Sequence, residues 1–385
     1  MEDKKHKNIL VVNGVLDGHF TGSVEIVKDL VSLGYYVTCY VLDEFADRIK
    51  DVEAKIVVYT VERSKFRIHR NAPSFAITAF VFSAAIDEVM ALILKEKNNY
   101  DYYIFDSFFE IEEMNKVLQI PINKLVKIYT SFIFTDEDPT DLSTRRINIL
   151  KPTSMKYKIN LHDFLVIHYS PNKFPKLILT SKFFHLRSEN TDETCFFIGP
   201  SIEKKKIDEN FNFKKDNNKK LIYISLGTVF NREDDFYIKC IEAFKDSEDY
   251  QVVISVGKSI DTKKFGDIPK NITLFNYVPQ TQILTDVDIF ITHGGLNSTQ
   301  EGLLAGIPLI IIPQRYDQFD NAKRVEQLEA GIFLDKNKID PTTLKKAVND
   351  IVCNKEKYKK GVAKIVKSFK ESRNNRKSIY EKIFV

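Results

Sequence analysis

Tryptophan is absent from this sequence of 385 residues, and cysteine is scarce. The four cysteines, Cys39, Cys195, Cys240 and Cys353, form no CxxC pair and no regular spacing. This argues against a disulfide framework or a thiolate metal site and favours a reducing compartment, the cytoplasm. The longest mostly apolar run, 75–86, is too short to span a bilayer and is expected to form a buried helix. We expect no signal peptide, because residues 1–8 precede only four clearly apolar residues.

An excess of charge of one sign is also lacking. Lysine and arginine number 57 against 53 acidic residues, which leaves a net charge of +4. This balance argues against nucleic acid as a partner. The hydrophobic fraction, 43%, is that of a globular protein with room for two or three domains.

Short apolar runs alternate with helical stretches in both halves of the chain, which predicts parallel, doubly wound α/β sheets. A loop over 13–22 and a helix over 23–33 are expected after the first run. A polar, unperiodic stretch, 203–220, is expected to be a linker between domains 1–202 and 221–365. Strands are expected at 9–12, 36–42, 56–59, 102–105 and 126–129 in the first half, and at 221–226, 252–256, 272–275, 288–292 and 309–312 in the second.

The stretch from Tyr277 to Gly331 carries the strongest functional signal. The expected strand 288–292 is followed by two glycines and then by a helix, with Asn297 or Ser298 at the N-cap and Glu301 completing a capping box. The N–H groups at such a helix start attract phosphate. His293, Asn297 and Ser298 add side-chain donors, so this turn is predicted to form an anion cradle.

With Pro279-Gln280 upstream and Asp317-Gln318 and Asn321-Ala322 downstream, this stretch resembles the donor-binding signature of the family 1 UDP-dependent glycosyltransferases. It resembles their bacterial, macrolide-type branch most closely. The resemblance implies a GT-B fold, in which two Rossmann-like domains face a central cleft. It assigns the acceptor to 1–202 and the nucleotide sugar to 221–365, and implies that the final helix, 366–385, packs back on the N-terminal domain.

The same resemblance implies roles for residues of the second half. Tyr277 stands where relatives usually place Trp or Phe to stack on the base, and Glu301 is expected to bind the ribose 2′,3′-diol, which favours UDP over dTDP. Gln280 is expected to contact the uracil or ribose, and Asp317 with Gln318 the transferred sugar. The implied donor-binding set is Gly227, Thr228, Tyr277, Val278, Gln280, His293, Gly295, Asn297, Ser298, Glu301, Asp317 and Gln318.

Near the first expected strand, Gly18-His19 aligns with the "GH" of this family, whose histidine is the catalytic base. Asp106, at the end of the expected strand 102–105, is the candidate that orients the imidazole. The family's proline after this motif is replaced by Thr21-Gly22. Gly14, Gly18 and Gly22 do not form GxGxxG, so no dinucleotide cofactor is expected, and the donor sugar is the only cofactor-like ligand.

The predicted reaction is a one-step displacement in which His19 deprotonates a small, apolar or aromatic acceptor, UDP leaves and the anomeric configuration inverts. Possible acceptor walls are Phe75–Phe82, Ser131–Phe134 and Phe183–Phe184. Two acidic triplets, Asp136-Glu137-Asp138 and Asp286-Val287-Asp288, are expected to be solvated turns, so no metal site is predicted. Three alternatives remain open: a dTDP-deoxysugar-dependent antibiotic glycosyltransferase, a non-catalytic nucleotide-sugar-binding protein, and an enzyme that glycosylates lipid at a membrane surface without a membrane span.

Overall fold

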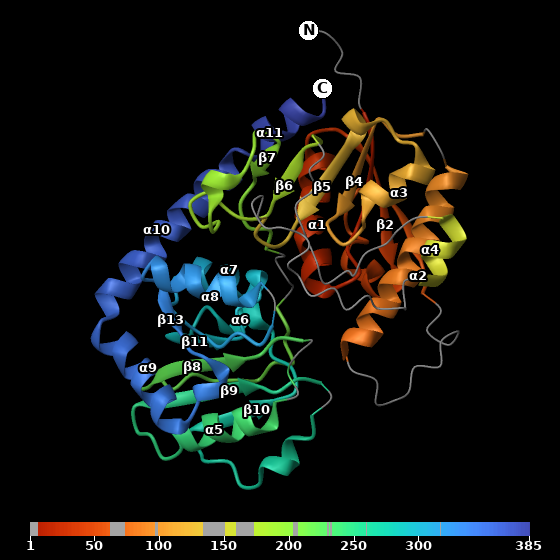
Figure 1. Ribbon diagram of the computed structural model, residues 1–385. Helices are drawn as coiled ribbons and strands as arrows, with labels where there is room; N and C mark the ends of the chain where they lie inside the picture. The colour runs from red at the N-terminus through yellow and green to blue at the C-terminus, as the bar shows by residue number, and fades with distance from the viewer. Residues whose placement is uncertain are drawn as a thin grey trace. The chain divides into compact units, whose positions relative to one another are not determined.

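The computed structural model describes residues 7–61, 74–96, 99–133, 151–158, 173–202, 207–228, 231, 233–258, 260–315 and 317–385. The chain folds into two compact units (Figure 1). The first comprises Met1–Lys182, Arg187–Glu203 and Glu371–Val385, and the second comprises Phe183–Leu186 and Lys204–Lys370.

The first unit is built on a parallel sheet of seven strands in the order β3-β2-β1-β4-β5-β6-β7. Its strand order reverses beside β1, which pairs with both β2 and β4, so ligands are expected at the carboxyl ends of these strands. The strands are β1 (Asn8–Val12), β2 (Tyr36–Leu42), β3 (Lys55–Tyr59), β4 (Tyr102–Asp106), β5 (Leu125–Tyr129), β6 (Lys176–Ile178) and β7 (Cys195–Phe197). The helices are α1 (Asp17–Ser32), α2 (Ser74–Lys95), α3 (Ile111–Leu118), α4 (Lys151–Tyr157) and α11 (Arg376–Ile383).

The second unit has a parallel sheet of six strands in the order β10-β9-β8-β11-β12-β13. Its strands are β8 (Lys220–Ser225), β9 (Tyr250–Ser255), β10 (Ile272–Phe275), β11 (Ile289–Thr292), β12 (Leu309–Ile311) and β13 (Gly331–Phe333). Its helices are α5 (Asp234–Phe244), α6 (Gln280–Ile283), α7 (Leu296–Leu304), α8 (Gln318–Gln327), α9 (Pro341–Cys353) and α10 (Lys355–Asn374), whose last residues belong to the first unit. Each strand expected from the sequence is confirmed, whereas β6, β7 and β13 were not expected.

The loop expected over 13–22 is wrong, because α1 already begins at Asp17. Glycine is a poor helix former, yet Gly22 lies within this helix and has a packing reason to be there. A Cβ at Gly22 would lie 2.6 Å from Leu179 Cδ1 and 3.1 Å from Thr130 Cγ2. The missing side chain therefore lets α1 approach the ends of β5 and β6.

The C-terminal residues 371–385 are anchored in the first unit by Arg376. Its buried guanidinium donates from Nη1 to Glu25 Oε2 at 2.8 Å and to Asp29 Oδ2 at 3.2 Å. Nη2 donates to the carbonyl of Pro200 at 2.6 Å. A buried charge satisfied on several sides fixes the chain end, because removing the arginine would leave these acceptors unpaired.

A short segment, Phe183–Leu186, leaves the first unit and belongs to the second. Arg324 holds its backbone by donating to the carbonyls of Phe183 and Phe184. The buried ring of Phe184 packs edge-on against Phe369, with centroids 5.4 Å apart. Phe183 and Phe184, expected in the N-terminal half as an acceptor wall, therefore belong to the second unit.

The described part of the stretch expected to be a linker, 203–220, folds onto the second unit. Lys215 forms an ion pair with Asp288 at 3.0 Å, and the amide of Asp216 donates to Gln251 Oε1 at 2.8 Å. The stretch is polar because it covers a sheet edge, where its side chains meet polar partners.

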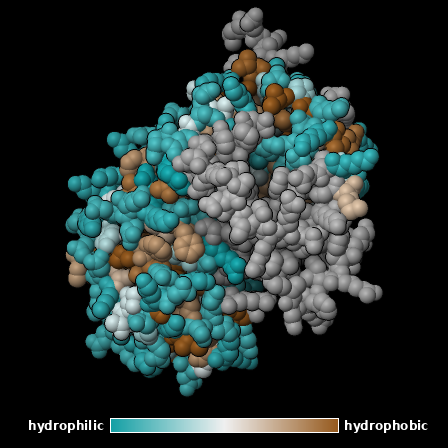
Figure 2. Space-filling view, in the orientation of Figure 1, coloured by the Kyte–Doolittle hydropathy of each residue, from teal (hydrophilic) through white to brown (hydrophobic). Residues whose placement is uncertain are grey.

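The described surface on the face shown in Figure 2 is mostly hydrophilic, with apolar side chains in small separate groups. Among the helices that the structure describes, none has the length and apolar character needed to cross a membrane.

Candidate active site

His19 and Asp106 are hydrogen-bonded at the carboxyl edge of the first sheet. His19 lies in the first turn of α1, directly after β1, and Asp106 is the last residue of the neighbouring strand β4. The imidazole Nδ1 lies 3.0 Å from each carboxylate oxygen. The carboxylate is fully buried, whereas 13% of the histidine side chain is exposed. The fold thus brings together two residues that are 87 positions apart in the sequence.

The hydrogen bonds of Asp106 fix the tautomer of His19. The carboxylate Oδ1 also accepts from the backbone N–H of Phe108 at 3.0 Å, so Asp106 acts as an acceptor on both sides. Its partner Nδ1 must then carry a hydrogen, which leaves the lone pair of the neutral imidazole on Nε2. A lone pair held in a fixed direction beside solvent is what a general base requires.

Three residues that the sequence did not single out shape this pair. A Cβ at Gly14 would lie 2.4 Å from His19 Cβ and 2.9 Å from Asp106 Cγ, so only glycine leaves room for the two side chains. The hydroxyl of Thr130 lies 2.9 Å from Nδ1 and 3.0 Å from Nε2, and the ring of Phe108 packs on the imidazole with centroids 3.8 Å apart. All three come one or two residues after the end of a strand, and that position is the signal that would have found them.

In the second unit, a sharp turn joins β11 to α7. Gly294 has φ +85°, and a Cβ there would lie 2.4 Å from Ile311 Cγ2, so the turn requires glycine. Gly295 is the N-cap of α7 and offers no capping side chain. Asn297 and Ser298 lie in the first helical turn, so their expected N-cap position is wrong. The glycine cap leaves the leading N–H groups of α7 without a side-chain cap.

Glu301 does not complete a capping box, because it lies too far along α7 to reach the N-cap N–H. Instead its Oε2 accepts from Gln280 Nε2 at 2.6 Å. The same amide nitrogen lies 3.1 Å from Ser298 Oγ. Three residues of the expected donor-binding set are therefore joined in one polar group, with a carboxylate that Gln280 orients.

The imidazole of His293 lies between two glycines of the expected set. A Cβ at Gly227 would lie 2.6 Å from its Cε1, and a Cβ at Gly295 would lie 2.6 Å from its Nε2. Burial lowers the pKa of His293 to about 4, against which a hydrogen bond to the backbone of Ser225 has a smaller effect. At neutral pH this ring is uncharged, so it serves the turn as a hydrogen-bonding group and not as a cation. Thr228 follows Gly227 and is exposed at the same edge.

Tyr277 presents a partly open aromatic surface just after β10. Its side chain is 46% exposed, whereas Val278 is buried. Lys258, from the loop after the neighbouring strand β9, places its ammonium 5.4 Å from the Tyr277 ring centroid. Such a cation–π contact holds the ring while leaving area for stacking. The sequence did not indicate Lys258.

Gln318 opens α8 and Asp317 precedes it as the N-cap. The amide oxygen of Gln318 accepts from the backbone N–H groups of Gln314 and Arg315, at 2.8 and 3.0 Å. Because this oxygen holds its own loop, the NH2 group is the part of the side chain that remains to meet a ligand. Asn321 ties the two helix starts together by donating to the Gly294 carbonyl at 2.8 Å.

Among the described residues, no group of three or more histidine, cysteine or acidic side chains is arranged to hold a metal ion. Asp288, from one acidic triplet, accepts instead from the backbone N–H of Leu221 at 2.9 Å and from Lys215. The other triplet, Asp136-Glu137-Asp138, lies outside the described residues, as do Phe134 and the side chains of 75–80 among the expected acceptor walls.

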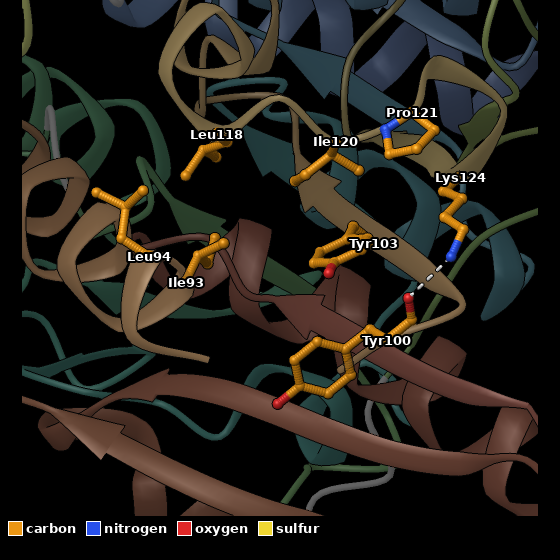
Figure 3. A pocket seen from close by; sticks show the side chains of 8 residues that line it. All are labelled: Ile93, Leu94, Tyr100, Tyr103, Leu118, Ile120, Pro121 and Lys124. Carbon is orange, nitrogen blue, oxygen red and sulfur yellow. Dashed lines mark hydrogen bonds between the residues drawn. The ribbon is translucent and has the colours of Figure 1, made fainter. Parts of the chain in front are cut away.

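Figure 3 shows a separate small cavity of the first unit, of about 60 Å³. It lies between the end of α2 and the residues that lead into β4 and β5, at the amino edge of the sheet. Tyr100, Tyr103 and Lys124 line it, and Lys124 Nζ donates to the Tyr100 carbonyl at 3.4 Å. The cavity is therefore at the opposite edge of the sheet from His19.

Comparison with known proteins finds one family model and several glycosyltransferases that are similar to this chain. Residues 245–374 match a family model described as the C-terminal domain of proteins similar to erythromycin biosynthesis protein CIII. The chain is 30% identical over 383 residues to the uncharacterized UDP-glucosyltransferase YdhE of Bacillus subtilis, covering 95% of each chain. It is 32% identical over 359 residues to the NDP-glycosyltransferase YjiC of Bacillus licheniformis, covering 89% of each.

Among solved structures, the fold is similar to that of the glycotransferase of kitacinnamycin. The TM-score is 0.77 at 22% identity, and the match covers 98% of each chain.

Proposed function

Because the chain belongs to the family 1 UDP-dependent glycosyltransferases, in their bacterial macrolide-type branch, we propose that it transfers glucose from UDP-glucose to a hydroxyl group of a small acceptor. It is a glycosyltransferase with the GT-B fold, whose two Rossmann-like domains are the two doubly wound units. The observation that carries the proposed reaction is the hydrogen bond between His19 and Asp106.

His19 acts as the general base. Its Nε2 takes the proton of the acceptor hydroxyl as the oxygen attacks the anomeric carbon. Asp106 stabilises the imidazolium that forms, because its buried carboxylate accepts the Nδ1 hydrogen throughout. The hydroxyl of Thr130 lies 3.0 Å from Nε2. When the acceptor binds, its hydroxyl replaces that of Thr130 as the hydrogen-bond partner of this nitrogen.

The second unit binds the donor. Tyr277 stacks on the uracil, and Glu301, oriented by Gln280, accepts hydrogen bonds from the ribose diol. A dTDP-sugar lacks the 2′-hydroxyl, which favours UDP. Relatives named as UDP-glucosyltransferases support glucose as the transferred sugar, with Asp317 and Gln318 receiving its hydroxyls.

The diphosphate, which is the leaving group of the reaction, is bound at the start of α7. As the new carbon–oxygen bond forms, the electron pair of the anomeric C–O bond passes to the β-phosphate. The leading N–H groups of α7, the neutral His293 and the Thr228 hydroxyl meet this charge. Attack opposite the leaving group converts an α-linked donor into a β-glycoside. The acceptor is a small aromatic or apolar natural product, and the four free cysteines favour the bacterial cytoplasm as the compartment.

The variants His19→Ala and Asp106→Asn test this proposal. With UDP-glucose and a panel of phenols, UDP release by His19→Ala should fall by roughly 10² to 10⁴, the usual contribution of a general base. Calorimetry should show UDP affinity unchanged in both variants, because both residues lie in the first unit. Turnover by His19→Ala equal to that of the unmodified protein would remove the base assignment, and failure of the unmodified protein to bind UDP would remove the donor assignment.

A further inference from the structure

Three buried hydroxyl groups without a hydrogen-bond partner lie at the carboxyl edge of the first sheet. Ser107, Ser131 and Thr180 have side chains exposed by 6%, 7% and 0%. None of their hydroxyl oxygens has a hydrogen-bond partner within the part of the chain that the structure describes. A buried polar group left unpaired costs stability, so such groups are uncommon and their clustering has a cause.

The three residues stand on adjacent strands. Ser107 follows Asp106, the last residue of β4. Ser131 and Thr180 lie two residues beyond Tyr129 and Ile178, which are paired between β5 and β6. Neighbouring strands are about 4.8 Å apart, so the three hydroxyls occupy one short row at the sheet edge.

This row adjoins the catalytic pair. Ser107 is next in sequence to Asp106, and Ser131 is next to Thr130, whose hydroxyl contacts the imidazole of His19. A molecule whose hydroxyl reaches Nε2 of His19 would therefore pass over the same edge. The unpaired hydroxyls gather where the acceptor is expected.

Several buried hydroxyls away from this edge are paired, whereas that of Thr299 in the second unit is not. Ser83 and Thr153, between α2 and α4, lie 2.9 Å apart. The hydroxyl of Ser23 donates to Asn13. Among the described residues of the first unit, the unpaired buried serine and threonine hydroxyls are thus confined to this edge.

We infer that Ser107, Ser131 and Thr180 form a hydroxyl shelf that binds the acceptor through oxygens other than the one that is glycosylated. A hydroxyl can donate and accept, so its partners on the ligand are further hydroxyl or carbonyl groups. The inference rests on the proposed function and narrows its acceptor from apolar aromatic compounds in general to those with several oxygens, such as polyphenols.

Thermal unfolding of the free protein is the first test. Ser131→Ala and Thr180→Val each remove an unpaired hydroxyl, so both should raise the unfolding midpoint, by a few degrees at most. Ser83→Ala, the matched control, removes a paired hydroxyl and should lower it. A lower midpoint for both shelf variants would mean that the protein itself satisfies these hydroxyls, and would overturn the inference.

Kinetics with two acceptors are the second test. The unmodified protein should prefer a flavonol, which carries several oxygens, to 1-naphthol, which carries one. Ser131→Ala and Thr180→Val should each lower kcat/KM for the flavonol by about tenfold through KM, and leave 1-naphthol nearly unchanged. Thr180→Ser, which keeps the hydroxyl, should retain flavonol activity.

The outcomes separate the shelf from the proposed function. Equal loss on both acceptors, no loss on either, or a preference for 1-naphthol would overturn the shelf while the transferase proposal stands. Absence of transfer to any acceptor would overturn both.

Discussion

Replacing Gly14 with alanine should disable the enzyme without touching a reacting group. Gly14 does not have a positive φ, so the backbone accepts alanine. The new Cβ, however, would lie 2.4 Å from His19 Cβ, against an ordinary contact of 3.4 Å or more. The histidine must therefore move by about 1 Å, the difference between these distances. This shift would stretch its 3.0 Å hydrogen bond to Asp106 beyond the useful range.

A misplacement of about 1 Å typically costs about 10² in rate, which is roughly 3 kcal/mol of transition-state stabilisation. Initial rates of UDP release measure this loss, and calorimetry should find UDP affinity unchanged because the proposed donor site is in the second unit. In a His19→Ala background, Gly14→Ala should cost little further activity, since both changes act through the same base. Unmodified kcat in the single variant, or full additivity in the double variant, would refute the reasoning.

Three further predictions concern the donor site, the pH dependence and the chain end. The Glu301→Ala variant should bind UDP about tenfold more weakly and lose the preference for UDP over dUDP, as calorimetry would measure; no such preference in the unmodified protein would contradict the ribose assignment. Burial lowers the pKa of both His293 and His185 from 6.5 to about 4, so the second unit should be fully stable above pH 6.5 and lose on the order of 3 kcal/mol per histidine as the pH falls towards 4. Urea unfolding at several pH values should show a shallower slope for the His185→Gln and His293→Gln variants, and an unchanged slope would count against the burial argument. The Arg376→Met variant should destabilise the first unit by about 3–5 kcal/mol, whereas the exposed neighbour Lys377→Met should not; equal unfolding midpoints for the two variants would contradict the anchoring role.

Apolar runs predicted most of both sheets because a strand buried on both faces is apolar throughout, as β12 (Leu309–Ile311) is. The three strands that were not predicted are three residues long, and two of them, β6 and β13, break this pattern. β6 begins with Lys176, a fully buried lysine whose ammonium donates to Thr194 Oγ1 at 2.6 Å. β13 begins with Gly331, where a Cβ would lie 2.1 Å from the carbonyl oxygen of Leu309. The polarity of Lys176 and the small size of Gly331 are explained by contacts with residues distant in the sequence, and a pattern of apolar residues along the chain does not show such contacts.

The residues of the candidate site were likewise predicted only in part from the sequence. His19 and Asp106 were predicted as a pair because both follow strands at the same sheet edge and Gly18-His19 resembles the family's motif. The structure shows them hydrogen-bonded, and their roles in the reaction stay a prediction. Gly14 and Thr130 were missed because their importance lies in contacts with residues distant in sequence. The N-cap was misplaced because Asn297 and Ser298 have the right residue types, whereas the N-cap is Gly295, where a Cβ would lie 2.6 Å from His293 Nε2.

The discontinuity of the first unit has a consequence for synthesis. Its sheet is translated early, but the residues that complete it, Glu371–Val385, are translated only after the second unit. During elongation the nascent chain exposes the surface that Arg376 and Tyr380 later cover, while the whole second unit is still being made. Folding of the N-terminal half therefore reaches completion only after the second unit has been synthesised, and any premature stop within α10 yields a chain whose first unit remains unfinished.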